Sequence, residues 1–435
     1  KGGDPIIYGR GGEEALKLQE AGIDFEIIPG ISSSTAAPLY AGIPLTQRHI
    51  ASSFAVITGH EADDKEKSTV DIEKISAAVD TLVVLMGVGN LSRITERVIA
   101  AGKSPNTPAA LVSWGTRTRQ QTVVGTLSNI ADKINKIGLK PPAVIIIGDV
   151  VNLREKLTWF EKKSLFGRQI LITRPAAQAE SFAEMIEAEA GAAVKAPVIR
   201  IEGAEDKRPL QEAVTNLKEY THLIFTSVNG VEYFTAELEK MSKDIRALAG
   251  LKIMTIGSKT AEKLKEHGIR ADYIPEDYST EGILNYLTEL EKKGEIDFRT
   301  ASFLLPRADI APERLENALK KMGADVDNIT AYRTVRVGLE PEILDMIIDD
   351  KIDLLTFTSS STVRYFVKGI KELIDTAEFD QSTAAEVMKK VKSIPAVSIG
   401  PVTAETAAEQ GLNTAASADV YTIEGLMEAV KTYFA

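Results

Sequence analysis

The sequence contains no cysteine among its 435 residues. This absence excludes disulfides, thiolate metal ligands and cysteine nucleophiles. A reducing compartment suits such a chain, so we expect a cytoplasmic protein. Histidine is also scarce, and the four residues show no pair with the spacing of metal ligands, so we predict no metal site. They are His49, His60, His222 and His267.

Long apolar runs and an excess of positive charge are also absent. The longest apolar runs, such as residues 143–147, are far shorter than the ~20 residues that a membrane span needs. Residues 1–164 carry 19 basic and 18 acidic side chains, and residues 165–435 carry 32 and 44. Neither part has the basic surface typical of nucleic-acid-binding proteins. We therefore predict neither a membrane nor a nucleic-acid partner.

What the sequence does contain is the pattern of an α/β protein. Short β-branched runs alternate with amphipathic stretches, and the length predicts two to four domains of roughly 100–200 residues each. The first part has predicted strands at residues 25–28, 54–58, 82–86 and 144–147, and predicted helices at residues 13–21, 91–101 and 128–137. Because Lys1 opens directly on a Gly-Gly-Asp-Pro loop, we expect further sequence ahead of it.

The second part contains an internal repeat. Segments at residues 170–174, 225–234, 256–261 and 278–282 recur at residues 303–307, 357–366, 399–404 and 421–425. The offset changes from about 132 to 143 residues, which an 11-residue insertion near residues 375–390 explains. This period is too long for a solenoid unit and predicts two similar α/β lobes with a cleft between them.

Glycine- and serine-rich loops in the first part are candidates for binding a ligand. Such loops let a ligand approach the backbone closely, but each is also explained as an ordinary turn or helix cap, and Met86 also as a core residue. Loops at the carboxyl ends of strands converge on one crevice in an open α/β sheet, which favours one shared site. The residues concerned are Gly2, Gly3, Asp4, Ser32, Ser33, Met86 and Gly115.

Hydroxyl side chains in the second part follow predicted strands and precede predicted helices. Each one alone is explained as a helix cap. Their presence in both lobes favours a ligand that carries many carboxylates and is held at helix starts. A protein that binds a polycarboxylate without chemistry satisfies this pattern as well as an enzyme does. The residues are Thr226, Ser227, Ser258, Thr260, Ser359, Ser360 and Thr403.

Several motifs of the first part also carry a family resemblance. They are Gly-Gly-Asp-Pro at residues 2–5, Pro-Gly-Ile at 29–31, Ala-Gly-Ile-Pro-Leu-Thr at 41–46, Ile-Thr-Gly-His at 57–60 and Met-Gly-Val at 86–88. With these, residues 1–161 resemble the tetrapyrrole methylases, specifically uroporphyrinogen-III C-methyltransferase, although Gln47 stands where that family usually has histidine. The resemblance implies methyl transfer from S-adenosylmethionine to C2 and C7 of uroporphyrinogen III, giving precorrin-2, in a homodimer formed through this domain. The cofactor-binding residues that it implies are Gly2, Gly3, Asp4, Ile7, Ser32, Ser33, Met86 and Gly115.

Motifs of the second part carry another resemblance. They are Leu-Ile-Thr-Arg-Pro at residues 171–175, Phe-Thr-Ser-Val-Asn-Gly at 225–230, Ala-Tyr-Arg-Thr at 331–334, Phe-Thr-Ser-Ser at 357–360 and Ile-Gly-Pro-Val-Thr at 399–403. Residues 166–435 thereby resemble uroporphyrinogen-III synthase, which closes hydroxymethylbilane to uroporphyrinogen III without a cofactor and inverts the last pyrrole, ring D. Tyr332 matches a family tyrosine proposed to assist departure of the hydroxyl group; packing at the hinge between the lobes is the alternative role. The substrate-binding residues that the resemblance implies are Arg174, Thr226, Ser227, Asn229, Ser258, Thr260, Ser359, Ser360 and Thr403.

Together the resemblances imply a tetrapyrrole methylase-type α/β domain followed by a bilobed synthase of two similar parallel, flavodoxin-like α/β lobes. The expected bounds are residues 1–161 for the methylase domain without its amino-terminal part, 162–165 for a linker, 166–201 with 336–435 for lobe 1, and 202–335 for lobe 2. Since the product of a synthase is the substrate of such a methylase, we expect a bifunctional enzyme of siroheme or cobalamin synthesis. The alternatives are an active synthase with an inactive methylase part, and the polycarboxylate-binding protein.

Overall fold

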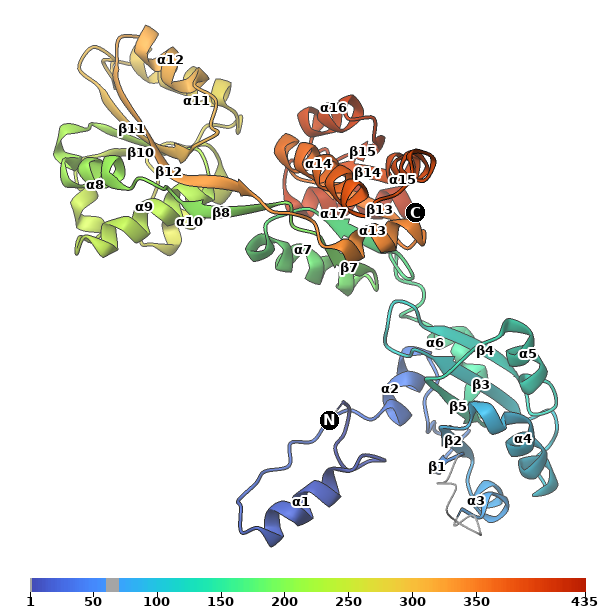
Figure 1. Cartoon of the computed structure of the whole chain (residues 1–435). Coiled ribbons are helices and arrows are strands. Elements are labelled where there is room, and N and C mark those ends of the chain that lie inside the picture. Colours follow the sequence, from blue (N-terminus) through green and yellow to red (C-terminus); the bar gives the residue numbers. More distant parts are fainter. Residues whose placement is uncertain (1, 60–69) are drawn as a thin grey trace.

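Three five-stranded sheets organise the protein in the computed structural model, which describes residues 2–59 and 70–435. Figure 1 shows one sheet in the amino-terminal unit and one in each of two further units, which we call lobe 1 and lobe 2. His60, which belongs to one of the methylase-like motifs, and Lys1 lie outside the described residues. Within the described ranges, no helix combines the length and the apolar character that crossing a membrane requires.

The sheet of the amino-terminal unit has the strand order β1-β2-β5-β3-β4. Only β1 and β2 are parallel to each other, and the remaining pairs are antiparallel. The central strands β2 and β5 are apolar and buried almost throughout, which explains why the sequence pattern predicts them to within one residue, whereas the buried strand β3 was not predicted. The elements are α1 (Gly11–Glu20), α2 (Ser33–Tyr40), β1 (Phe54–Thr58), α3 (Ile72–Ala78), β2 (Thr81–Leu85), α4 (Leu91–Ala100), β3 (Pro108–Ser113), β4 (Gln121–Thr126), α5 (Ile130–Ile137), β5 (Ala143–Ile147) and α6 (Arg154–Leu157).

The strand predicted at residues 25–28 is wrong. The backbone there is extended, but it joins no sheet among the described residues, and Phe25, Ile27 and Ile28 are exposed. A strand needs a neighbouring strand to satisfy its backbone groups, and periodicity alone does not reveal whether one is present. The preceding helix α1 likewise has no buried residue. In Figure 1 this dark blue segment extends away from the sheet of its own unit.

Lobe 1 contains a fully parallel sheet of order β15-β14-β13-β6-β7. Counted along the chain within this lobe, the order is 2-1-3-4-5, which is the flavodoxin-like order. Two separate stretches of the chain therefore build one sheet. The elements are β6 (Gln169–Ile172), α7 (Ala176–Ala188), β7 (Ala192–Lys195), α13 (Pro341–Ile348), β13 (Leu354–Phe357), α14 (Ser360–Thr376), α15 (Gln381–Ser393), β14 (Pro395–Ser398), α16 (Pro401–Glu409), β15 (Asn413–Ser417) and α17 (Ile423–Phe434).

Lobe 2 is formed by the residues between these two stretches. Its sheet has the order β10-β9-β11-β12-β8, and only β8, at the edge, is antiparallel to its neighbour. Figure 1 shows β8 and β12 passing side by side toward lobe 1. The elements are β8 (Ile199–Gly203), α8 (Arg208–Thr215), β9 (His222–Phe225), α9 (Val228–Lys240), β10 (Lys252–Thr255), α10 (Ser258–Glu266), α11 (Thr280–Lys292), β11 (Ser302–Ala308), α12 (Arg314–Lys321) and β12 (Asp325–Arg336).

The sequence repeat corresponds to equivalent elements of the two lobes. The repeated segments contain parts of β6 and β11, the last residues of β9 and β13 with the helices that follow them, the starts of α10 and α16 just after β10 and β14, and the starts of α11 and α17. The central strands therefore have the same spatial neighbours in both lobes, but lobe 2 begins at a different point of the cycle. Lobe 2 is thus a circular permutation of lobe 1. The helix α15, which has no equivalent in lobe 2, lies where the sequence predicts an insertion.

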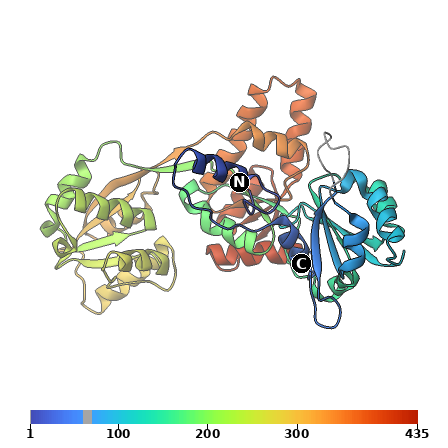
Figure 2. The same ribbon diagram turned by 90° about the horizontal axis from the view of Figure 1, so that it is seen from below.

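The junction between the amino-terminal unit and lobe 1 contains an aromatic cluster. The ring of Phe160 lies 4.8 Å from that of Tyr40 on α2 and 5.5 Å from that of Phe166, next to lobe 1. Trp159 contacts both Tyr40 and Phe160. The junction is therefore packed by side chains rather than being a bare linker. Figure 2 shows the sheet of the amino-terminal unit and lobe 2 on opposite sides of lobe 1, with the dark blue segment overlapping lobe 1 in this view.

Candidate functional site

The carboxyl ends of the strands in the two lobes face each other. The central strands of each lobe are parallel, so the residues that follow them lie along one edge of the sheet. Gln178 of lobe 1 donates from Nε2 to Oδ1 of Asn229 in lobe 2 at 3.1 Å. Lys259 of lobe 2 places Nζ 2.9 Å from a carboxylate oxygen of Glu424 in lobe 1. We call the surface around these four residues the interlobe face.

Two of the predicted hydroxyls are helix caps with equivalent positions in the two lobes. Ser227 accepts a hydrogen bond from the backbone N–H of Gly230 at 3.0 Å, and Ser359 accepts one from Thr362 at 3.3 Å. Each begins the helix after a central strand, α9 or α14. The capping interpretation is therefore correct for both, and a role in binding a ligand stays a prediction for both.

Tyr332 lies on β12, beside the cap of α9. Its hydroxyl is 2.9 Å from Oγ of Ser227, and its ring stacks on Tyr233 with 5.8 Å between the centroids. The side chain is only 7% exposed. The structure therefore brings together two predicted residues, the candidate acid Tyr332 and Ser227, that are 105 positions apart in the sequence.

Arg174 follows β6 and contributes a partly buried cation. Its Nη2 donates to Oε1 of Gln178 at 3.2 Å, and its Nε has no hydrogen-bond partner within the described part of the chain. Burial lowers the pKa of Arg174, and the charge of Glu424 opposes that shift. Through Gln178, Arg174 is linked to Asn229 of the other lobe. A buried N–H without a partner is uncommon and marks a place where a ligand acceptor would be stabilising.

The other predicted substrate residues lie at the same strand ends but in different environments. Thr226 and Asn229 are half-buried beside Ser227, and Ser258 is exposed at the start of α10. Ser360 accepts a hydrogen bond from the hydroxyl of Thr406 at 2.7 Å. Thr260 and Thr403 are buried over most of their surface, and a role of their hydroxyls in binding a ligand stays a prediction.

Three residues of the interlobe face are missing from the sequence prediction. Gln178, Lys259 and Glu424 bridge the lobes, yet none belongs to a motif that suggests a site on its own. Glu424 lies within the repeated segment at residues 421–425, and Lys259 lies between two predicted residues of α10. Their places in or beside the repeated segments could have marked both residues as candidates. The ion pair between them, however, depends on how the two lobes lie against each other.

The predicted cofactor residues near the amino terminus form a tight backbone crossing. Asp4 accepts hydrogen bonds from the N–H groups of Ile6 and Ile7 at 3.0 and 3.1 Å, and from that of Gly30 at 3.2 Å. The bonds from Ile6 and Gly30 lower the pKa of Asp4 most. A Cβ atom on Gly30 would lie 2.3 Å from the carbonyl oxygen of Gly3, so this crossing admits no side chain. The crossing thereby places residues 2–7 against the loop that precedes α2.

The remaining predicted cofactor residues lie around α2 and the nearby sheet edge. Ser32 caps α2 through the N–H of Ser34, Ser33 is exposed, and a Cβ on Gly115 would lie 2.6 Å from Cβ of Ala37 on α2. Leu85 and Val112 both pair with Val144 of β5, so β2 and β3 end at the same sheet edge. Met86 and Gly115, which follow these strands, are therefore at one edge, two strands apart. Met86 is exposed and has a φ of 52°, which makes its alternative role in the core incorrect.

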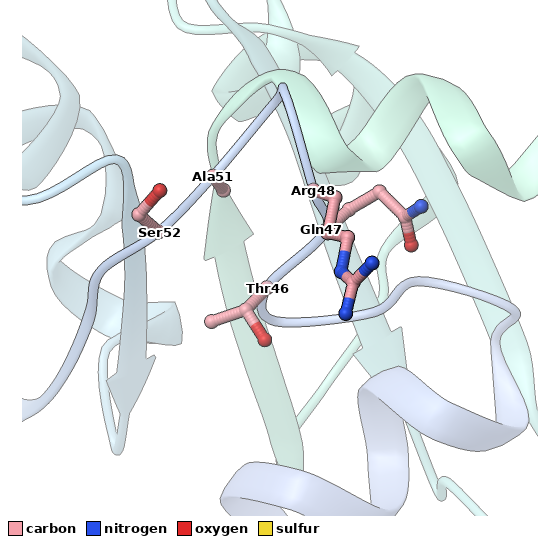
Figure 3. A pocket seen from close by; sticks show the side chains of 5 residues that line it. All are labelled: Thr46, Gln47, Arg48, Ala51 and Ser52. Carbon is pink, nitrogen blue, oxygen red and sulfur yellow. The ribbon is translucent and has the colours of Figure 1, made fainter.

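A cavity of about 460 Å³ lies elsewhere in this unit, around the turn that contains Gln47 and Arg48. In Figure 3 the side chains of these two residues leave the same loop, with Thr46, Ala51 and Ser52 completing the lining. The backbone N–H of Ser52 donates to Asp80, the residue just before β2. The cavity is therefore at the amino ends of β1 and β2, away from Met86 and Gly115.

Comparisons with known proteins assign both parts of the chain. Residues 180–428 match the family model "Uroporphyrinogen-III synthase HemD", and residues 1–131 match "Tetrapyrrole (Corrin/Porphyrin) Methylases". The "Porphyrin biosynthesis protein HemD" of Ruminiclostridium josui is 34% identical over 413 residues, which is 95% of this chain and 77% of that protein.

Two further relatives match the amino-terminal part alone. The "S-adenosyl-L-methionine-dependent uroporphyrinogen III methyltransferase" of Methanosarcina barkeri is 48% identical over 157 residues, 36% of this chain and 62% of that enzyme. A crystal structure of uroporphyrin-III C-methyl transferase from Thermus thermophilus, complexed with S-adenyl homocysteine, is 36% identical over 35% of this chain and 64% of that chain, with a TM-score of 0.30. This chain thus spans less than two thirds of either methyltransferase. The protein belongs to the uroporphyrinogen-III synthase family, with a domain of the tetrapyrrole methylase family preceding the synthase part.

Proposed function

We propose that the protein performs two successive steps of tetrapyrrole synthesis. Lobes 1 and 2 close hydroxymethylbilane to uroporphyrinogen III with inversion of ring D, and the methylase domain then methylates uroporphyrinogen III at C2 and C7 to give precorrin-2. The presence of both families in one chain supports this pairing, because the product of the first reaction is the substrate of the second. The interlobe face carries the proposal for the first step, since it joins two cations, amide groups and hydroxyls from both lobes.

The cyclisation requires little chemistry from the protein. The C–O bond of the hydroxymethyl group breaks, water leaves, and the pyrrole nitrogen stabilises the resulting cation. The substituted carbon of ring D then forms a C–C bond to this cation, giving a spiro intermediate. The bond from the spiro carbon to the bridging carbon of ring C breaks next, which leaves a cation that the nitrogen of ring C stabilises. The free α carbon of ring D attacks this bridging carbon and loses its proton, so that ring D ends inverted. Holding the flexible chain in the geometry for attack at the substituted carbon is the main task, which suits a two-sided binding face.

Tyr332 is the proposed acid for departure of the hydroxyl group. A hydroxyl group leaves as water only if it receives a proton, and a phenol can donate one. Ser227 already accepts the N–H of Gly230, so its own hydrogen is free to point at the oxygen of Tyr332. That arrangement leaves the phenol hydrogen of Tyr332 available for the substrate. Ser227 is therefore proposed as the residue that orients Tyr332.

The methylase domain is proposed to use S-adenosylmethionine, as the name of the Methanosarcina relative suggests for that enzyme. The residues of this chain fit such a group: the crossing of Gly3 and Gly30 leaves bare backbone, and nothing lies within 4 Å of a Cβ position on Gly2. Gly2, Gly3 and Ser33 would hold the cofactor on one side, and Met86 and Gly115 on the other. The cofactor, when bound, supplies the methyl group. The chain's own part is to bind it, to orient it and to exclude water.

A product analysis tests both proposals. The protein is supplied with hydroxymethylbilane and S-adenosylmethionine, and the tetrapyrroles are separated by chromatography with mass detection. Type III isomer with two added methyl groups is the expected result. Unmethylated type III isomer would favour the alternative of an active synthase with an inactive methylase part. Type I isomer alone, which forms spontaneously, would contradict the synthase proposal and favour the polycarboxylate-binding protein.

A further inference from the structure

The ion pair between Lys259 and Glu424 joins two lobes that the chain connects only through neighbouring strands. Lys259 is the second residue of α10 in lobe 2, and Glu424 is the second residue of α17 in lobe 1. Their charged groups are 2.9 Å apart, and their side chains are 48% and 67% exposed. Water and solutes therefore reach both charges, and a competing anion can reach the ammonium group of Lys259.

The position of Lys259 is unfavourable for its own helix. A positive charge in the first turn opposes the helix dipole, whereas the negative charge of Glu424 in the first turn of α17 is stabilised by it. The side chain of Lys259 therefore contributes nothing favourable to α10 and needs an anion nearby. In this structure that anion is Glu424, whose pKa is lowered by the hydrogen bond from Lys259 together with hydrogen bonds from its own backbone N–H and from Thr422.

Arg174 adds a second cation at the same place. The negative charge of Glu424 raises the pKa of Arg174 against the effect of burial, and Nε of Arg174 has no hydrogen-bond partner among the described residues. One carboxylate thus balances two cations on the interlobe face. Residues 165–435 have 32 basic and 44 acidic side chains, so acidic groups outnumber basic ones in the synthase part as a whole. Around Glu424 the local balance is reversed, because Arg174 and Lys259 both interact with this one carboxylate.

We propose that Glu424 occupies the place of a substrate carboxylate and competes with the substrate for Lys259. When a polycarboxylate tetrapyrrole enters between the lobes, one of its carboxylates replaces Glu424 as the partner of Lys259, and the bridge between the lobes is exchanged for one through the ligand. An exposed ion pair of this kind is weak, so such an exchange is easy for a ligand carboxylate. This inference rests on the proposed function, because it takes a tetrapyrrole carboxylate as the ligand.

The exchange predicts opposite effects of the two partners on affinity. In Glu424→Gln the competitor is neutral, so uroporphyrinogen III binds about two- to fivefold more tightly, which is the strength of an exposed ion pair. In Lys259→Gln the ligand loses a charged partner that is equally exposed, so binding weakens by about two- to fivefold. A bridge that only holds the lobes together predicts the same direction for both variants, because each removes the same contact.

The experiment measures the affinity of the full-length protein for uroporphyrinogen III under reducing conditions, for the wild type, both single variants and the double variant. Lys431→Gln is the matched control, because Lys431 pairs with Glu428 within the same helix α17 and not across the lobes. Opposite shifts for Glu424→Gln and Lys259→Gln, with no shift for the control, are the expected result. Shifts in the same direction, no shift in Glu424→Gln, or no binding by the wild type would each overturn the exchange.

A parallel assay of cyclisation separates this inference from the proposed function. If the wild type makes no type III isomer but the affinities shift in opposite directions, the synthase proposal fails and the exchange at Lys259 stands. If type III isomer forms but the affinities shift together, the reverse holds. Thermal unfolding of each variant shows whether a loss of affinity reflects loss of fold.

Discussion

The replacement of Tyr332 by phenylalanine tests the proposed acid most directly. The change removes one oxygen atom, which is 2.9 Å from Oγ of Ser227, and leaves the ring stacked on Tyr233. Ser227 keeps its hydrogen bond from Gly230. The loss of one hydrogen bond without an orphaned backbone group costs about 0.5–1.5 kcal/mol of unfolding free energy. The fold should therefore survive the substitution.

The expected effect on catalysis is much larger than the effect on stability. A positioned general acid contributes typically 10²–10⁴-fold to a rate, so the formation of type III isomer should slow by about that factor. The rate constant kcat should fall while KM for hydroxymethylbilane changes little, because the missing proton acts on the departing group and not on the carboxylates. The assay follows type III isomer by chromatography within seconds of mixing, before spontaneous type I isomer accumulates.

The matched control is Tyr233→Phe. Tyr233 belongs to the same pair of stacked rings, and its hydroxyl donates to the carbonyl oxygen of Ile201 at 3.1 Å. This variant also loses one hydrogen bond of a tyrosine hydroxyl, here to a backbone carbonyl, so its stability should fall by at least as much, with kcat unchanged. If Tyr332→Phe keeps kcat within about twofold of the wild type, the acid role is refuted and the tyrosine serves packing at the hinge.

Three further predictions follow from other parts of the molecule. Gly30→Ala forces a methyl group to within 2.3 Å of a backbone carbonyl oxygen, so S-adenosylmethionine should bind at least about tenfold more weakly in calorimetry. Gly12→Ala is the control, because nothing lies within 4 Å of that Cβ position, and it should not change binding. Equal affinities of the two variants would refute the crossing of Gly3 and Gly30 as part of the site. Burial lowers the pKa of His222 from 6.5 to about 4, so the unfolded state binds the proton first and stability falls as the pH drops from 6.5 to 4. The loss should be roughly 2 kcal/mol after allowance for partial solvent screening, and urea unfolding of His222→Gln should lack this component; an identical pH profile in the variant would contradict it. Phe160→Ala should cost about 3–5 kcal/mol of unfolding free energy because this ring is only 6% exposed, and Trp159→Ala, at 42% exposed, should lower the unfolding temperature of the amino-terminal unit less.

The sequence was sufficient to predict those strands whose local residue pattern alone determines their structure. The buried strands β2 and β5 are short runs rich in β-branched residues, and the repeat identified equivalent segments of the two lobes. Residues 25–28 show the limit of such patterns: they have the composition of a strand, but a sheet also needs a partner strand. The register and order of the sheets, including the permuted order of lobe 2, depend on contacts between distant segments and could not be predicted.

The candidate site divides in the same way. Ser227 and Tyr332 were each predicted from their motifs, but the contact between them depends on how β12 passes α9. Lys259 and Glu424 are 165 positions apart and lie in different lobes, so nothing local reveals that they pair. Met86 was ambiguous because a methionine after a strand is usually in the core. Its exposure follows from the loop it occupies and not from its own character.

The insertion of lobe 2 into lobe 1 has a consequence for the order of folding. The β6–β13 ladder of lobe 1 pairs Ile170 with Leu354, and β13 begins about 160 residues after β7 ends at Lys195. At a synthesis rate of about 5–20 residues per second, the apolar strands β6 and β7 wait roughly 10–30 s for their partners. Lobe 2 is continuous in sequence and can complete its own sheet in that time.

Folding of lobe 2 first would also make the completion of lobe 1 easier. Its two ends are neighbours, because Ile199 of β8 pairs with Arg336 of β12 in the antiparallel ladder. Once that ladder forms, the loop that separates β7 from β13 shrinks from well over a hundred residues to the short segments outside the ladder. The conformational entropy lost on closing a loop grows with the length of the loop. Early folding of lobe 2 therefore reduces the entropy that is lost when β13 pairs with β6 in lobe 1. The same pair of strands that links the two lobes thus favours the folding of lobe 2 before lobe 1.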